Sequence, residues 1–369
     1  MTITHKTTAR QLGAILLLIR LAPMTLTLPN IIGMPSPQGL WITGILGTAI
    51  SLPLLAWMVT LCRAEGLDDV VRISRRLLGT IIGSAVGWLF VLYWLILAGF
   101  ELRSVSEAYL TGAMPETPMW VFTALTALVS AGIARRGMRL IAMMSELVAF
   151  LVLVLVLLTI VLPLDLIDLR NLLPLLPEGL RPLALPTGTA VSLFLDMAVL
   201  MMVAPTVIGG RGLMQGTIWA ALVAGAVLTL LIAAVTAVFG PISTALELPA
   251  LSLSRIVSMG QVIERIELTM MASWTLGVGV ALAVLLWAAS VASAHLLGLR
   301  CFEPLVYPLG GLAVFLGMRM WTDVGSFDRS VTAIRATLVT SVFIMVVLVV
   351  LTAASWLRRR TSGDAGGRE

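Results

Sequence analysis

The chain has 369 residues, of which 59% are apolar and only 12% are Asp, Glu, Lys or Arg, and its mean hydropathy is +1.05. A soluble domain carries about 25% charged residues, so this chain lacks the polar groups that would cover a water-exposed surface. The composition excludes a soluble enzyme, a disordered protein and a nucleic-acid-binding domain, and the net charge of +5 needs a membrane explanation.

Apolar segments follow one another along almost the whole chain. A helix needs about 20 predominantly apolar residues to cross the hydrocarbon core. Ten segments meet or approach this length and predict an all-α polytopic membrane protein: residues 11–33, 39–61, 77–101, 117–134, 140–162, 188–209, 214–239, 266–297, 304–319 and 332–357. Residues 1–357 are therefore expected to form a single transmembrane domain, and the basic, Gly-rich tail 358–369 is expected to be disordered.

Basic residues are distributed unevenly between the two sides of the predicted bundle. If the N-terminus is cytoplasmic, fifteen of the 24 Lys and Arg residues fall on the cytoplasmic side and eight on the other, with Arg20 inside the first span. Cytoplasmic loops carry an excess of positive charge, so both termini are expected to be cytoplasmic. The same bias accounts for the basic charge balance without any nucleic acid.

A polar, proline-rich segment divides the ten spans into two groups of five. Residues 163–186 contain five prolines and several charges, and are expected to connect half one, 10–163, to half two, 187–357, on the external side. An odd number of spans per half inverts the second half relative to the first. Inverted repeats of this kind are typical of secondary transporters, whose binding site lies where broken helices meet near the middle of the membrane.

The first span of each half contains both a helix breaker and an ionisable residue. Span one has Arg20 and Pro23, and span six has Asp196 and Pro205. Proline removes a backbone hydrogen bond and clashes with the preceding turn, so broken helices 1 and 6 are expected. The alternative is that these prolines only kink continuous helices.

Two charges lie deep in the predicted spans. Arg20 is about 15 Å into span one, and Asp196 is about 13 Å into span six from the opposite face, at 1.5 Å per residue. A charge at this depth costs several kcal/mol and needs a partner or a purpose. We expect Arg20 and Asp196 to face each other or to share a central cavity. The alternative is a structural ion pair that binds nothing.

Several neighbours of these two charges are candidate ligand contacts. The exposed backbone at a break in span one would offer hydrogen bonds, and Met197 follows the acidic residue of span six. The candidate ligand-binding residues are Arg20, Ala22, Pro23, Met24, Thr25, Asp196 and Met197, with Glu146 and Pro205 as candidates for coupling or gating. Glu146 has a packing role as its alternative, and Glu101, Arg103 and Glu107 are expected to form an interfacial cluster. Nothing in the sequence predicts a catalytic centre, a metal site or a cofactor.

Several motifs in order resemble those of one family. They are Leu110–Trp120 (LTGAMPETPMW), Asn171–Pro182 (NLLPLLPEGLRP), Phe239-Gly240-Pro241, Glu264-Arg265 with Trp274, Pro304–Gly311 (PLVYPLGG) and Arg139–Glu146 (RLIAMMSE). The chain resembles the B subunit of bacterial spore germinant receptors, a branch of the amino acid/polyamine/organocation transporter superfamily. The resemblance implies a LeuT-like, five-plus-five inverted repeat and a germinant pocket, typically for an amino acid, between helices 1 and 6. It also implies an A-type membrane subunit and a C-type lipoprotein subunit as partners in the spore inner membrane.

The sequence departs from the family pattern at the expected pocket. Ala22-Pro23-Met24 stands where glycine-rich residues are usual, and Ala281 stands where a lysine is frequent, so Arg20 is a candidate replacement for that charge. Three functions remain open: a ligand-sensing receptor subunit, an amino acid transporter coupled to a proton or Na⁺, and an ion or water conduit gated by partner subunits. The fold alone does not choose among them.

Overall fold

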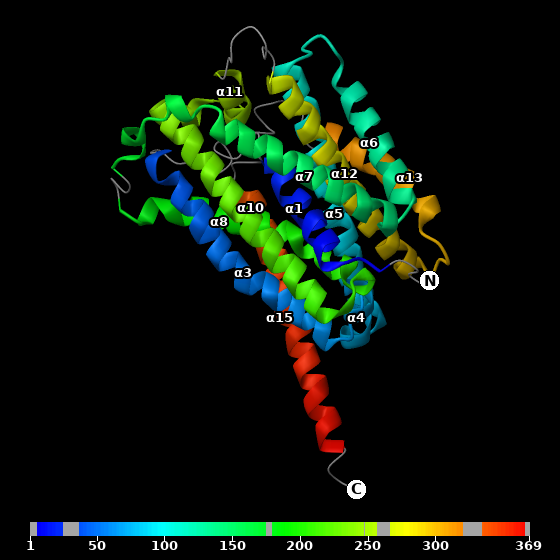
Figure 1. Ribbon diagram of the computed structural model, residues 1–369. Coiled ribbons are helices and arrows are strands. Elements are labelled where there is room, and N and C mark those ends of the chain that lie inside the picture. The colour runs from blue at the N-terminus through cyan, green and yellow to red at the C-terminus, as the bar shows by residue number, and fades with distance from the viewer. Residues whose placement is uncertain are drawn as a thin grey trace.

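The computed structural model describes residues 6–24, 37–174, 179–246, 248–256, 266–319 and 334–365. Helices run through each of the ten predicted spans (Figure 1). In half one they are α1 (Ala9–Met24), α3 (Leu40–Ala64), α5 (Thr80–Gly112), α6 (Met119–Arg135) and α7 (Met138–Val161). In half two they are α8 (Ala184–Leu195) with its short continuations to Thr206, α10 (Gly209–Phe239), α12 (Ile266–Leu297), α13 (Glu303–Arg319) and α15 (Ile334–Ala365).

Seven of the described helical segments are long and apolar enough to cross a membrane, and α1, α6 and α13 are shorter, with 16, 17 and 17 residues. Two helices extend further than predicted. α5 continues through Gly112, so Glu101 and Arg103 are buried within a helix where an interfacial cluster was expected. α15 is helical to Ala365 and its last turns project beyond the bundle, where a disordered tail from Arg358 was expected (Figure 1).

Short elements connect the spans. α4 (Val70–Leu78) lies between α3 and α5, and the predicted connection between the halves contains the 3-10 turns η2 (Leu164–Leu166), η3 (Leu169–Leu172) and η4 (Arg181–Leu183). η7 (Gly240–Ala245) and α11 (Pro249–Ile256) follow α10. The turn η1 (Pro37–Gly39) leads directly into α3.

The core is built around α1, which packs against α7, α10 and α12 (Figure 1). The side chains of Leu12, Ile15, Leu16, Leu18 and Leu21 on this helix are at most 1% exposed. Hydropathy alone does not require this, because an apolar helix can equally face lipid; α1 is enclosed because three helices pack around it. Burial of the apolar windows is 83% in α12 and 78% in span six, against 33% in α7 and 28% in α15, so the latter two form the periphery.

α3 and α10 cross at two matched glycines. A Cβ atom at Gly44 of α3 would collide with Thr229 of α10, and a Cβ atom at Gly225 of α10 would collide with Thr48 of α3. The glycine of each helix therefore packs against the threonine of the other, and in both helices the threonine follows the glycine by four residues. Small residues let helix backbones approach closely in membranes, which explains this crossing.

Span six is interrupted, but not at the proline. The α-helix ends at Leu195, the 3-10 turn η5 (Asp196–Val199) follows, and α9 (Leu200–Val203) resumes the helix. Pro205 lies in η6 (Ala204–Thr206), the last turn of the span, so its assignment as the breaker is wrong. Proline is tolerated there because it stands in the first turn of η6, where its missing N–H would have no partner within that turn, and the chain becomes extended at Val207.

The start of span one is joined to the end of span six. The backbone N–H of Thr7 donates to the carbonyl of Thr206 at 2.6 Å, and the N–H of Ile208 donates to the carbonyl of Thr7 at 2.9 Å. The Thr7 and Thr206 hydroxyls are 3.1 Å apart. Among the described residues, this link contains an isolated β-bridge between Thr7 and Val207. Within the described chain, α1 ends at Met24, with Pro23 in its final turn.

Candidate functional site

Arg20 is buried in the core with open hydrogen-bonding capacity. Its side chain, on α1, is 2% exposed, and its guanidinium carbon lies 4.5 Å from the centre of the Phe194 ring on α8. Its Nε and Nη1 atoms have no hydrogen-bond partner among the described residues. Buried donors of this kind are rare, since each unpaired group costs about 1–3 kcal/mol.

Asp196 begins the 3-10 turn of span six and interacts electrostatically with Arg20. The Tyr93 hydroxyl of α5 donates a hydrogen bond of 2.6 Å to Asp196 Oδ1. The two predicted midplane charges are thus brought into one region. The ion pairs found among the described residues do not include a direct contact between them. Space or a third group therefore separates Arg20 from the carboxylate.

The sequence did not predict two members of this cluster. Glu101 of α5 is 6% exposed, its Oε2 atom has no partner among the described residues, and it interacts electrostatically with Asp196. Tyr93, on the same helix, holds Asp196 directly. Positions i and i+8 fall in one helical stripe, so the Tyr93–Glu101 spacing in an apolar helix is the signal that would have indicated them. The nearby ion pair between Arg103 and Glu107, predicted from their spacing, does form.

The other predicted site residues divide into three groups. Met197 is fully buried beside Asp196. Ala22, Pro23 and Met24 complete the last turn of α1, with side chains outside the described part of the structure, and Thr25 lies outside the described residues altogether. Pro205 lies nine residues beyond Asp196, at the far end of span six.

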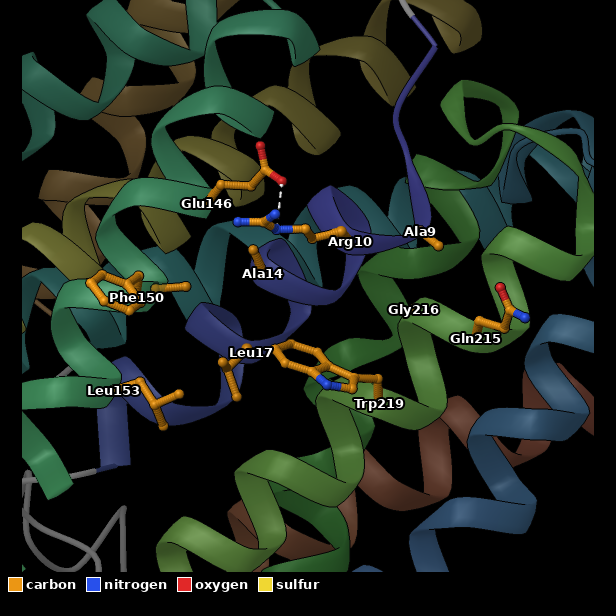
Figure 2. Close-up of a pocket in the computed structure, with 11 residues that line it drawn as sticks. Ala9, Arg10, Ala14, Leu17, Glu146, Phe150, Leu153, Gln215, Gly216 and Trp219 are labelled. Carbon is orange, nitrogen blue, oxygen red and sulfur yellow. Dashed lines mark ion pairs between the residues drawn. The ribbon is translucent and has the colours of Figure 1, made fainter.

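Glu146 lies outside the Arg20 cluster. Its carboxylate contacts Arg10 Nε at 3.2 Å and accepts a hydrogen bond from Gln11 Nε2 at 3.3 Å (Figure 2). These contacts join α7 to the first turn of α1. The carboxylate therefore bridges two helices at the end of the bundle where α1 begins, at a distance from the buried cluster.

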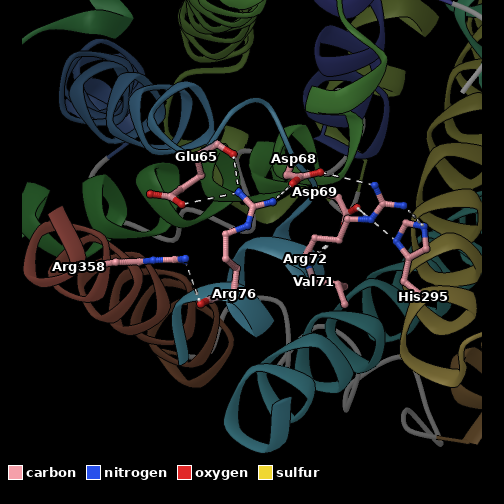
Figure 3. A network of polar contacts seen from close by, with 8 residues as sticks. All are labelled: Glu65, Asp68, Asp69, Val71, Arg72, Arg76, His295 and Arg358. Atoms are coloured by element: carbon pink, nitrogen blue, oxygen red, sulfur yellow. Dashed lines mark hydrogen bonds and ion pairs between the residues drawn. The ribbon is translucent and has the colours of Figure 1, made fainter. Parts of the chain in front are cut away.

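A dense polar network surrounds α4 at that end of the bundle (Figure 3). Asp69 caps α4 by accepting hydrogen bonds from the N–H groups of Val71 and Arg72, and its carboxylate lies 3.3 Å from His295 Nδ1 of α12. Burial acts to raise the pKa of Asp69, but the imidazole of His295 and the N–H and guanidinium of Arg72 favour the charged form, so its pKa lies below the ordinary value.

α4 packs against α5, α12 and α15. Val70, Val71 and Ile73 are fully buried, because the apolar face of the helix meets the bundle and its basic face is left for the network. Arg76 pairs with Asp68 and Glu65, and Ser355 of α15 donates to Glu65 at 2.6 Å. The network thus links α4 to the final helix.

Sequence comparison identifies the family. The profile of the family described as spore germination protein matches residues 6–323. The chain belongs to the spore germination protein family. It is 24% identical over 319 residues to Bacillus subtilis spore germination protein KB, covering 85% of both chains, and 29% identical over 182 residues to spore germination protein YndE of the same organism, covering 48% of this chain and 50% of that one.

The fold of this family member is that of LeuT-like transporters. It superposes on Mhp1, a nucleobase-cation-symport-1 family transporter in a closed conformation with bromovinylhydantoin bound, with a TM-score of 0.63 and 16% identity, over 92% of this chain and 78% of that chain. This likeness shows the fold and leaves the ligand open. The protein is a multi-pass, permease-like membrane protein related to spore germination, as its motifs indicated.

Proposed function

We propose that this protein is the germinant-sensing membrane subunit of a spore germination receptor. It binds a small molecule, an amino acid, in a mid-membrane pocket between helices 1 and 6, and signals by a conformational shift. One observation carries the proposal: two nitrogen atoms of Arg20 in the core have no hydrogen-bond partner among the described residues, and they lie beside a helix whose interruption begins at Asp196.

The charges of the cluster match those of an amino acid. Arg20 supplies N–H donors for a carboxylate, and charge-assisted hydrogen bonds of this type are about twice as strong as neutral ones. Asp196 and Glu101 supply acceptors for an ammonium group. With one cation and two carboxyl groups, the cluster has the charges to complement a ligand that brings a positive charge near Asp196 and a negative charge near Arg20. The predicted contacts at Ala22, Pro23, Met24, Thr25 and Met197 would surround the ligand.

Signalling follows from the links that hold α1 in place. A ligand shifts a conformational equilibrium by its differential affinity for the two states. A ligand that holds Arg20 and Asp196 together favours one position of α1 relative to span six. A change in the position of α1 would alter the Thr7–Thr206 link and the contact of Arg10 with Glu146. In this proposal Glu146 is therefore a gating residue.

Ligand binding is tested with the purified full-length protein in lipid nanodiscs, against a panel of radiolabelled L-amino acids. We expect at least one to bind, and Arg20→Met and Asp196→Asn to abolish its binding, with Arg136→Gln on the exposed end of α6 as the matched control. Spores that lack this protein are expected to lose the response to the same amino acid. An unchanged response of those spores to every amino acid and sugar contradicts the proposal.

We further propose that A-type and C-type subunits complete the receptor in the spore inner membrane, with both termini cytoplasmic. Cys301 is exposed and Cys62 is buried, so an impermeant maleimide has one expected target. Cys301 should be labelled in inside-out vesicles and protected in right-side-out vesicles. The opposite pattern would reverse the proposed orientation. Co-purification of A- and C-type subunits with the tagged protein tests the partners.

The likeness of the fold to a symporter supports a second candidate, a proton- or Na⁺-coupled amino acid transporter. Asp196 or Glu146 would then be the coupling carboxylate. Concentrative uptake of labelled amino acid into proteoliposomes, driven by an imposed gradient, favours the transporter, whereas binding without uptake favours the receptor. Ligand-independent conductance would favour a gated conduit.

A further inference from the structure

A groove with a volume of about 450 Å³ opens between α1, α7 and α10, away from the Arg20 cluster (Figure 2). Its volume is within the roughly 300–1,000 Å³ of small-molecule sites. It is lined by Ala9, Arg10, Ala14, Leu17, Glu146, Ala149, Phe150, Leu153, Gln215, Gly216 and Trp219.

One end of this groove is charged. Arg10 and Glu146 form an ion pair there, and their side chains are 86% and 29% exposed, so both remain accessible to a ligand. Arg10 is the second residue of α1, and Gln215 lies in the second turn of α10. The charged end therefore lies near the starts of α1 and α10, with Glu146 as the ninth residue of α7.

The rest of the groove is apolar and runs toward the middle of the helices. Leu17 follows Arg10 by seven residues and Leu153 follows Glu146 by the same number, which is about 10 Å along each helix. Phe150 and Trp219 form the walls and are 69% and 47% exposed on the surface of the bundle. In a membrane-spanning bundle, these exposed side chains face the lipid hydrocarbon.

The groove has a fixed floor. A Cβ atom at Gly216 would lie 2.5 Å from the carbonyl oxygen of Ala9, so α1 and α10 are in close backbone contact at this point. Ala14 and Ala149 complete the floor with methyl groups. Small residues on tightly packed helices keep the groove open, because they leave its volume unfilled.

We propose that this groove binds a membrane phospholipid with a zwitterionic ethanolamine headgroup. The phosphate contacts Arg10, the ammonium donates hydrogen bonds to Glu146, and an acyl chain lies along Leu17, Leu153 and Trp219. The groove offers one cation and one anion side by side, which matches a headgroup that carries both charges. A choline headgroup carries no N–H donor for the carboxylate and is therefore bound less well.

The bound lipid braces α1 against α7 and α10. Because α1 also carries Arg20, the lipid composition of the membrane sets how readily this helix moves. The binding site itself does not depend on the identity of the germinant.

Native mass spectrometry of the detergent-purified full-length protein tests the site with phosphatidylethanolamine, phosphatidylcholine and phosphatidylglycerol of the same acyl chains. We expect one phosphatidylethanolamine molecule to be retained, with roughly tenfold preference over phosphatidylcholine, the value of one charged hydrogen bond. Ala149→Phe fills the groove and should abolish retention, whereas Leu147→Phe, on an exposed position of the same helix, should leave it unchanged.

Glu146→Gln keeps the apolar groove and needs no change in packing. With this variant a lipid should still be retained, but the ethanolamine and choline lipids should be retained about equally. Equal retention of all three lipids by the wild-type protein, retention that survives Ala149→Phe, or an ethanolamine preference that survives Glu146→Gln would each overturn the proposal. A preference for phosphatidylglycerol would overturn it too, since Arg10 would then act without Glu146.

Discussion

Two charged regions of this protein use the same residue types in opposite ways. Around α4, Asp69 accepts two backbone N–H groups and contacts His295, and Arg76 contacts Asp68 and Glu65. Around Arg20, the guanidinium has two open nitrogen atoms, and the carboxylate of Glu101 has an open oxygen among the described residues. The first region lies at one end of the bundle and the second in its core.

The two regions differ in what their charges are available to do: those around α4 bind one another, and those around Arg20 are open to a ligand. In the α4 network, the buried carboxylate of Asp69 is held by two N–H groups and lies beside His295, so it joins helices and leaves little for a ligand to bind. Buried charges that are left open carry a large cost, and a protein keeps such groups where they have a use. The contrast supports the proposal that the Arg20 cluster recognises a ligand, whereas the α4 network acts as a structural clamp.

The largest expected effect is in the core. Arg20→Met leaves Asp196 and Glu101 without their nearby cation, and removal of one partner of a buried pair typically costs about 3–5 kcal/mol. The double variant Arg20→Met/Asp196→Leu should recover most of this free energy of unfolding. Denaturant unfolding of the purified protein measures both, with Arg136→Met as the control. Equal losses in the single and double variants would show that Arg20 and Asp196 are not coupled.

Tyr93→Phe is expected to have the next largest effect. It removes the hydroxyl that donates to Asp196 at 2.6 Å, and a hydrogen bond to a charged group contributes about 1.5–3 kcal/mol. The same unfolding measurement applies. Tyr307→Phe is the matched control, because Tyr307 is 43% exposed on α13 and its contact with Arg135 uses the ring. Comparable losses in both variants would contradict a special role for Tyr93.

Asp69→Asn tests the clamp: asparagine caps a helix as well as aspartate, so the expected loss of about 1 kcal/mol comes from the missing charge opposite His295 and Arg72. The pKa of Asp69 is below its ordinary value, so its charged carboxylate stabilises the folded protein fully above the unfolded pKa of about 3.9. This contribution is lost as the pH falls through the lower pKa of the folded state. The difference in stability between wild type and variant should therefore vanish in acid, while Asp165→Asn, an exposed control, shows no such trend. A pH-independent difference contradicts this account.

The smallest expected effect is that of Arg76→Ala. Arg76 makes two ion pairs, but its side chain is 39% exposed, and exposed pairs contribute about 0–1 kcal/mol. The loss should shrink further at high salt, because screening weakens pairs in contact with water. A loss as large as that of Arg20→Met would erase the distinction between the two regions.

The sequence was sufficient to predict the helices and the two deep charges. Hydropathy reports how long a segment can remain in hydrocarbon, and the depth of Arg20 and Asp196 follows from counting along their helices. The same reasoning could not find the ends of α5 and α15, since a helix that continues past the apolar stretch leaves no hydropathy signal.

The composition of the cluster was less predictable. Tyr93 reaches Asp196, and Glu101 interacts with it electrostatically, only because α5 comes close to span six there, and single-sequence patterns contain no information on which faces meet. The break in span six was predicted at the wrong residue. Proline was taken as the breaker, whereas the helix tightens at Asp196, whose carboxylate accepts a hydrogen bond from Tyr93.

The crossing of α3 and α10 bears on how the two halves of the chain can associate. Each is the second span of its half, and each gives a glycine to the threonine of the other at the same spacing. A contact in which two surfaces exchange identical roles is isologous, the geometry of a two-fold dimer. A five-helix half that is expressed alone would therefore present a self-complementary patch, and two such halves would be expected to associate through it without the connecting segment.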